Sequence, residues 1–96
     1  MKKILESLGL DFKVEARQGG EKITVSLHNG FELSAIRFDG TYGFEQGLWE
    51  CAAVKNGHVS YDTDTFGGDI AGWQTELNVV GLIDKLNEEL HEKFNR

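Results

Sequence analysis

The sequence predicts an α+β fold: a short N-terminal helix, about five antiparallel strands in meander order, and a C-terminal helix packed on one face of the sheet. Three observations predict it. Apolar and polar residues alternate over most of residues 12–38, which is the period of a strand with one wet face. Asn29-Gly30 and Asn56-Gly57 are typical of tight hairpins, in which both central residues have positive φ. Residues 75–96 instead carry apolar side chains three and four positions apart, as a helix does.

The first expected element is a helix from Lys2 to Leu8. Its apolar residues have helical spacing, and Gly9 follows them at the place where a left-handed residue ends many helices. A helix this short is marginal by itself. We therefore expect it to pack on the rest of the chain.

Three strands are expected between residues 12 and 38. The first two, 12–17 and 22–28, each have one apolar and one polar face. The third covers 31–38, and its apolar phase shifts by one residue after Ala35. A shift of this kind predicts a β-bulge near Ala35.

The second half of the chain is expected to supply a central strand, a short partner strand and the long helix. Residues 48–54 are apolar except at Glu50, which predicts a strand covered on much of both faces. A tight turn leads into the partner strand at 59–61. Thr75 is the expected N-cap of the helix.

Size and composition predict a single domain over residues 1–96. A chain of 96 residues with 40% apolar side chains can bury one core without staples. The single cysteine, Cys51, rules out an internal disulfide framework and Cys-rich zinc sites. No apolar run has the length of a membrane span, and Glu6 interrupts the pattern of a secretory signal. We therefore expect a cytoplasmic protein.

The net charge of −6 comes from the middle of the chain. Residues 39–76 contain seven acids and one base, Lys55, whereas the remaining residues sum to zero. Binding to a nucleic-acid backbone requires a cluster of basic residues, and the sequence has none. The charge favours a basic partner instead.

Two acidic, aromatic stretches are expected to lie side by side. Alternate turns of a meander fall at opposite ends of the sheet, so the loops 39–47 and 62–74 would share one end. Acids and rings on long loops are typical of recognition surfaces. The predicted partner-binding residues are Asp39, Tyr42, Phe44, Glu45, Asp62, Asp64, Phe66 and Asp69. The alternative is that the rings close the core and the acids only keep the loops soluble; Trp73, beside the helix start, is the ring most expected to be buried.

No catalytic or cofactor pattern is present. Asp62 and Asp64 begin like a calcium loop, but Phe66 and Trp73 stand where its fifth and twelfth positions need ligands. With Asp69 they could form at most a weak divalent-ion site. We predict no cofactor, no metal and no enzymatic activity.

Two further residues, Glu50 and Cys51, have side chains that can act in catalysis. Glu50 is the one charge in an apolar strand and hence the candidate for a perturbed carboxyl group; the alternative is a solvent-facing acid paired with a neighbouring strand. Cys51 is expected to be a small buried side chain rather than a nucleophile.

A run of short motifs spans about half of the chain, from Gly43 to Leu90. The motifs are Tyr42-Gly43, Gly47-Leu48-Trp49-Glu50, Asn56-Gly57, Tyr61-Asp62-Thr63, Gly72-Trp73 and Thr75-Glu76. This run resembles small phage-encoded proteins of undefined role. The resemblance implies phage origin, and small acidic α+β phage proteins often inhibit host defence nucleases, as anti-CRISPR proteins do.

Three functions follow as hypotheses. The first is a non-enzymatic inhibitor that binds a basic host protein, such as a CRISPR effector or another nuclease complex, and competes with nucleic acid or blocks assembly. The second is a phage structural or assembly module in which the exposed face of the sheet or the Asn-Gly end pairs with copies of itself. The third is a small hydrolase or metal-dependent enzyme using Asp62, Asp64 and Asp69. The missing motifs favour the first, without contact to nucleic acid or membrane; monomer and homodimer both stay open.

Overall fold

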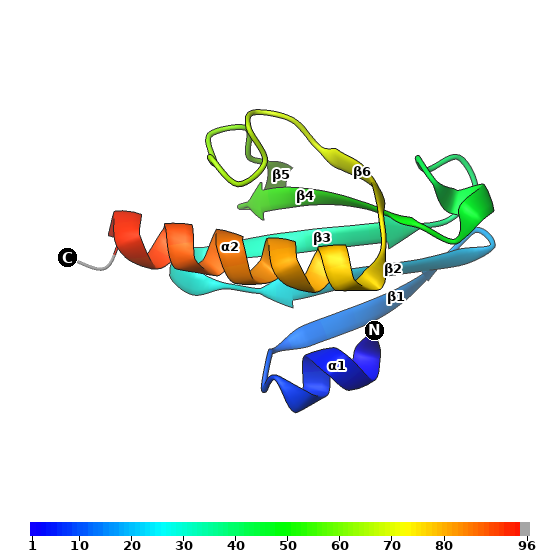
Figure 1. Cartoon of the computed structure of the whole chain (residues 1–96), viewed down its shortest axis with the longest axis horizontal. Helices are drawn as coiled ribbons and strands as arrows, with labels where there is room; N and C mark the ends of the chain where they lie inside the picture. The colour runs from blue at the N-terminus through cyan, green and yellow to red at the C-terminus, as the bar shows by residue number, and fades with distance from the viewer. Residues whose placement is uncertain (95–96) are drawn as a thin grey trace.

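The computed structural model describes residues 1–94 and has the predicted α+β fold. The α-helices are α1 (Lys2–Ser7) and α2 (Glu76–Phe94), and two short 3-10 turns are η1 (His28–Gly30) and η2 (Phe44–Gln46). The strands are β1 (Phe12–Arg17), β2 (Gly20–Ser26), β3 (Phe31–Arg37), β4 (Trp49–Lys55), β5 (His58–Val59) and β6 (Ala71–Gln74). Figure 1 shows α2 lying along the sheet, with α1 beside it under β1.

All strand pairs are antiparallel. Strands β1 to β5 follow the predicted meander, and β6 also pairs with β4. Strand β5 pairs with the end of β4, at Val54 and Lys55, whereas β6 pairs with its beginning, at Trp49 and Cys51. The edge of β4 is therefore shared by two short strands.

The core lies between one sheet face and the two helices. Matching rows of buried residues cross the sheet, because Ile23 pairs with Ala35 and Ala35 pairs with Cys51. The apolar stripe of α2 covers these rows with Val79, Ile83, Leu86 and Leu90, and α1 adds Leu5. Burial of this stripe gives a helix most of its stability in a protein.

The predicted helix start is confirmed. The Asn78 N–H donates to Thr75 Oγ1, and the Thr75 N–H donates to Asn78 Oδ1, each at 3.1 Å. This reciprocal arrangement satisfies two of the backbone donors that a helix N-terminus leaves without a partner. The left-handed conformation expected at Gly9, with φ of 71°, is also present.

The bulge predicted at Ala35 is wrong. Strand β3 keeps an unbroken register with both neighbours through Ala35 and Ile36. The change of phase has another cause: Arg37 occupies a position on the helix side, where its guanidinium lies 4.3 Å from the centre of the Trp49 ring. Ile36 lies on the opposite face because side chains alternate along the strand.

Strand β4 is covered on one face only, contrary to the prediction. Trp49, Cys51 and Ala53 are buried under α2, but Glu50 and the alternate residues on the other face are half-buried. Both α-helices pack on the same side, so the second face of the described sheet has no helix over it. The expectation of a small buried thiol holds, since burial and then the nearby Glu50 charge raise the pKa of Cys51 to about 12.

The two acidic loops lie at opposite ends of the molecule, so the predicted juxtaposition is wrong. Strand β5 has only two residues, and the chain after it stays at the C-terminal end of α2 rather than crossing the sheet. Strand β6 makes the return along β4 instead. Figure 1 accordingly shows residues 60–70 beside β5 and the 39–47 loop at the far end of β4. Within residues 1–94, no helix is both long and apolar enough to cross a membrane.

Candidate binding surface

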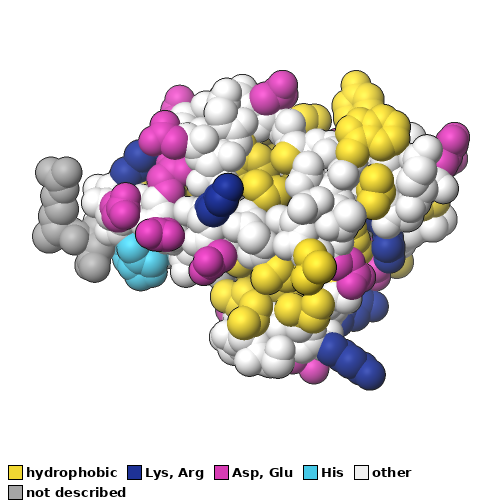
Figure 2. All heavy atoms as spheres, in the orientation of Figure 1, with side chains coloured by type: hydrophobic (Ala, Val, Ile, Leu, Met, Phe, Trp, Pro, Cys, Tyr) yellow, Lys and Arg dark blue, Asp and Glu magenta, His cyan; other side chains and the backbone are white. Residues whose placement is uncertain are grey.

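Two large rings stand exposed next to each other at the beginning of β4. The Tyr42 side chain is 60% exposed and that of Trp73 is 55% exposed. They lie with Asp39, Phe44 and Glu45 around a cavity of about 340 Å³. Figure 2 shows hydrophobic side chains projecting from the surface over β6 and the neighbouring loop. We call Asp39, Tyr42, Glu45 and Trp73 the aromatic–acidic surface.

Two glycines allow the segments that carry these rings to interlock. A Cβ atom at Gly72 would lie 3.0 Å from the Tyr42 Cβ. A Cβ atom at Gly43 would lie 3.2 Å from the Trp73 Cα and 2.9 Å from the Leu48 Cβ. Each glycine thus makes room for the residue that bears the ring of the other segment. The close fit fixes the backbone of the two ring-bearing residues relative to each other.

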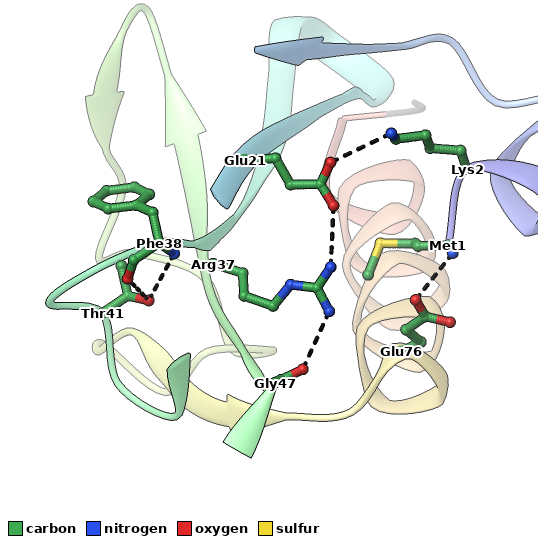
Figure 3. Close-up of polar contacts among 8 residues, drawn as sticks. All are labelled: Met1, Lys2, Glu21, Arg37, Phe38, Thr41, Gly47 and Glu76. Carbon is green, nitrogen blue, oxygen red and sulfur yellow. Dashed lines mark hydrogen bonds and ion pairs between the residues drawn. The ribbon is translucent and has the colours of Figure 1, made fainter. Parts of the chain in front are cut away.

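The 39–47 loop is held at both ends by hydrogen bonds. At its start, Thr41 Oγ1 accepts from the Phe38 N–H at 3.2 Å and donates to the Phe38 carbonyl at 2.9 Å (Figure 3). Next to it, the Tyr42 N–H donates to Glu50 Oε1 at 3.2 Å. A loop that is ordered before binding loses less conformational entropy when a partner arrives.

Arg37 anchors the other end of this loop. Its guanidinium donates to the Gly47 carbonyl at 3.3 Å and to Glu21 Oε1 at 3.2 Å, and Lys2 pairs with the second oxygen of Glu21 at 3.4 Å (Figure 3). The Arg37 guanidinium is therefore bound beneath the loop and lies over the Trp49 ring. The exposed charges of the aromatic–acidic surface are carboxylates.

A β-bulge turns Trp73 outward. Trp49 pairs with Gln74 and Cys51 pairs with Ala71, so Gly72 and Trp73 together face the single residue between them on β4. The backbone of Trp73 has φ of 61°, in the left-handed region that a bulky residue rarely occupies. Such strain persists only where the surroundings impose it, and it is common at functional sites. The prediction that Trp73 is buried is wrong for this reason.

The loop at the other end uses its polar groups internally. Glu89 of α2 accepts from the Asp64 N–H at 2.8 Å, from the Thr65 N–H at 2.7 Å and from the Thr65 hydroxyl at 2.6 Å. Lys93 donates to the same carboxylate at 2.8 Å. Burial works against ionisation of Glu89, but the hydrogen bonds from Lys93, Thr65 and Asp64 outweigh it and lower its pKa to about 2.

Phe66 belongs to the core. Its ring is only 9% exposed and joins the buried cluster under the 60–70 segment. Asp62, Asp64 and Asp69 are exposed around it, and Lys93 lies 3.8 Å from Asp64. The alternative considered for the rings, closure of the core, therefore applies to Phe66 and not to Tyr42.

The structure thus separates the eight predicted binding residues into two groups of four. Asp39, Tyr42, half-buried Phe44 and Glu45 lie together on the 39–47 loop. The other four lie on the 60–70 segment at the opposite end. Sequence reasoning missed Trp73 as a surface residue, although the glycine directly before it was a signal of an unusual backbone.

Metal-binding groups do not gather in the described residues. Within residues 1–94, no three His, Cys, Asp or Glu side chains lie close enough together to hold a metal ion. His28 and His91 stack with ring centroids 4.1 Å apart, near the C-terminal end of α2 and away from the aromatic–acidic surface.

Comparison of the chain with protein-family models, with curated proteins and with solved structures finds no match. The chemistry of the exposed side chains is therefore the basis for a functional assignment.

Proposed function

We propose that this protein is a non-enzymatic binding protein whose aromatic–acidic surface contacts a basic surface of another protein. The observation that carries the proposal is the pair of exposed rings, Tyr42 and Trp73, held side by side by interlocked glycines. A protein that exposes two large rings together is expected to use them, because Tyr and Trp supply a large share of binding energy at interfaces.

The flanking charges define the chemistry of the partner. Asp39 and Glu45 are exposed, and Glu50 lies close enough to bind the Tyr42 backbone. Carboxylates beside ring faces suit Arg and Lys, which can form an ion pair and a cation–π contact at the same site. A partner with a patch of Arg or Lys fits this surface best.

A protein that binds nucleic acid carries such a patch. Carboxylates placed where phosphates normally lie would compete with nucleic acid, and the protein would then act as an inhibitor. In a phage setting, the partner would be a host defence protein such as a CRISPR effector or another nuclease complex. Residues 39–50 supply the acids that this mode requires.

The proposal is tested by comparative capture from a bacterial lysate. Three proteins are immobilised: wild type, the variant Asp39→Lys/Glu45→Lys and the variant Asp62→Lys/Asp64→Lys. The two variants reverse the same number of charges at opposite ends of the molecule. We expect a basic protein that wild type and the second variant retain and the first variant loses. Its retention should fall as salt is raised, because exposed charges are screened.

Two results would overturn the proposal. One is that no protein is retained by wild type and lost by the Asp39→Lys/Glu45→Lys variant while that variant remains folded by circular dichroism. The other is that the Asp62→Lys/Asp64→Lys variant loses the captured protein instead, because the contact would then lie at the other end of the molecule.

A further inference from the structure

The sheet face turned away from the helices is open and divides into two unlike halves. It is hollowed, with a cavity of about 380 Å³ between Lys13, Lys22, Glu32 and Glu50. The strand register places Lys13 and Lys22 on β1 and β2, and Glu32 and Glu50 on β3 and β4. One half of the open face is therefore basic and the other is acidic.

The basic half keeps its excess charge. Glu15 lies between the lysines but pairs with Arg17 at 3.1 Å and with Lys13 at 3.9 Å. The Arg17 hydrogen bond outweighs desolvation and lowers the pKa of Glu15, with Lys13 and Lys22 adding to the effect. Among the described residues, Lys22 forms no ion pair of its own.

The acidic half also carries a strip of short apolar side chains. The strip consists of Ile36, Ala52, Val54, Val59 and Ile70, and these side chains are half-buried or exposed. Glu32 and Glu50 stand on the same strands as its first members. A surface that binds this strip must offer apolar atoms together with positive charges.

The basic half of another copy offers both. A lysine side chain has four methylene groups that can lie on apolar surface while its ammonium group reaches a carboxylate.

We propose that the open face binds a second copy of this chain, with the two sheets packed face to face about a two-fold axis that runs along the strands. This axis reverses the order of the strands, so β1 and β2 of one copy lie over β3 and β4 of the other. By the strand register, Lys13 and Lys22 of one copy then lie over Ala52 and Ile36 of the other, next to its Glu50, and the contact occurs twice. Glu15, which lies over Glu50 in this arrangement, is already paired with Arg17. Face-to-face sheets lie about 10 Å apart, a distance that lysine side chains can cross.

The other symmetric arrangement is unfavourable. A two-fold axis across the strands would place β1 over β1 and β4 over β4. Each half would then lie over the same half of the other copy, basic over basic and acidic over acidic, which costs free energy at an interface. The distribution of charge between the two halves therefore favours the axis along the strands.

The test uses charge reversal of each half. Variant A carries Lys13→Glu and Lys22→Glu. Variant B carries Glu32→Lys and Glu50→Gln; Glu50 is neutralised rather than reversed so that its amide oxygen can still accept from the Tyr42 N–H. Sedimentation equilibrium of wild type should show a monomer–dimer equilibrium with Kd on the order of 10 to 100 μM. Variants A and B alone should each dimerise at least about tenfold more weakly. An equimolar mixture of A and B should dimerise again, because both of its contacts pair acid with base.

The matched control is Lys3→Glu/Lys85→Glu, which changes the net charge as variant A does but lies on the exposed surfaces of α1 and α2. It should dimerise within about threefold of wild type, and all variants should keep the wild-type circular dichroism. Three results would overturn the proposal: wild type that stays monomeric to about 1 mM, dimerisation that A and B leave unchanged, or a mixture of A and B that stays monomeric.

Discussion

Two loops of similar composition have opposite roles in this fold. The 39–47 loop and the 60–70 segment both combine acids with rings. The 60–70 segment directs backbone donors into Glu89 and one of its two rings, Phe66, into the core, while its other ring, Tyr61, stays exposed. The 39–47 loop satisfies its own backbone and leaves Tyr42 exposed beside Trp73. Composition therefore does not decide which side chains of a loop are buried; the element that lies opposite the loop decides it.

The largest expected effect comes from removing the buried ring. Phe66→Ala leaves a cavity under the 60–70 segment and should lower the free energy of unfolding by about 3 kcal/mol. Urea unfolding measures it. Tyr42→Ala should cost less than about 0.5 kcal/mol. Equal losses for the two variants would remove the distinction between the loops.

A second substitution tests the interlock between the rings. Gly43 has φ of 89°, and a Cβ atom there would lie 2.9 Å from that of Leu48, whereas Gly47 has φ of 73° and open space around it. Both Gly43→Ala and Gly47→Ala strain the backbone, but only the first adds a steric clash. We expect losses of about 2 and about 1 kcal/mol in the free energy of unfolding. A smaller loss for Gly43→Ala than for Gly47→Ala would contradict the interlock.

The anchor of the 60–70 segment should make stability depend on pH. The folded-state pKa of Glu89 is about 2, below its ordinary value of 4.5. Ionised Glu89 therefore contributes its full stabilisation above about pH 4.5, and the contribution is lost as the pH falls toward 2. Glu89→Gln should lower the free energy of unfolding at pH 7 by about 1 kcal/mol.

Urea unfolding of both proteins between pH 2 and pH 7 measures this dependence. The difference between wild type and Glu89→Gln should shrink as the pH falls below 4.5 and be smallest near pH 2. A difference that stays constant over this range would show that the carboxylate is not the acceptor that holds the loop.

A small net effect on stability is expected from Trp73. Trp73→Gly removes ring contacts but also relieves the left-handed backbone, so these two changes oppose each other. The free energy of unfolding should change by less than about 1 kcal/mol. A loss above about 2 kcal/mol would indicate that the ring is a packing residue like Phe66.

Local patterns predicted most of the fold. Alternation located the first strands, the Asn-Gly pairs located two turns, and Thr75 located the start of α2. Each of these signals depends on neighbouring residues. The predictions that failed depended on residues distant in the sequence. Arg37 covers Trp49 of the neighbouring strand, and this contact, rather than a bulge at Ala35, explains the shift of apolar phase.

The candidate site was predicted in part for the same reason. The acids and Tyr42 of the 39–47 loop were found from composition. The predicted position of Asp62, Asp64 and Phe66 beside that loop was wrong, because it required β5 to cross the whole sheet. After the two residues of β5 the chain leaves β4, and Glu89 supplies the acceptors that hold the following loop at α2. Glu89 lies 25 residues further along the sequence than Asp64. The conformation that exposes Trp73 is likewise set by its contact with Gly43.

The most direct test of the aromatic–acidic surface compares two tyrosines of nearly equal exposure. Tyr42 is 60% exposed and Tyr61 is 57% exposed, at opposite ends of the molecule. The basic protein captured by wild type is titrated with Tyr42→Ser and with Tyr61→Ser. We predict that Tyr42→Ser weakens binding at least about tenfold and that Tyr61→Ser leaves it within about twofold. Binding that is unchanged by Tyr42→Ser, or weakened more by Tyr61→Ser, would contradict the assignment.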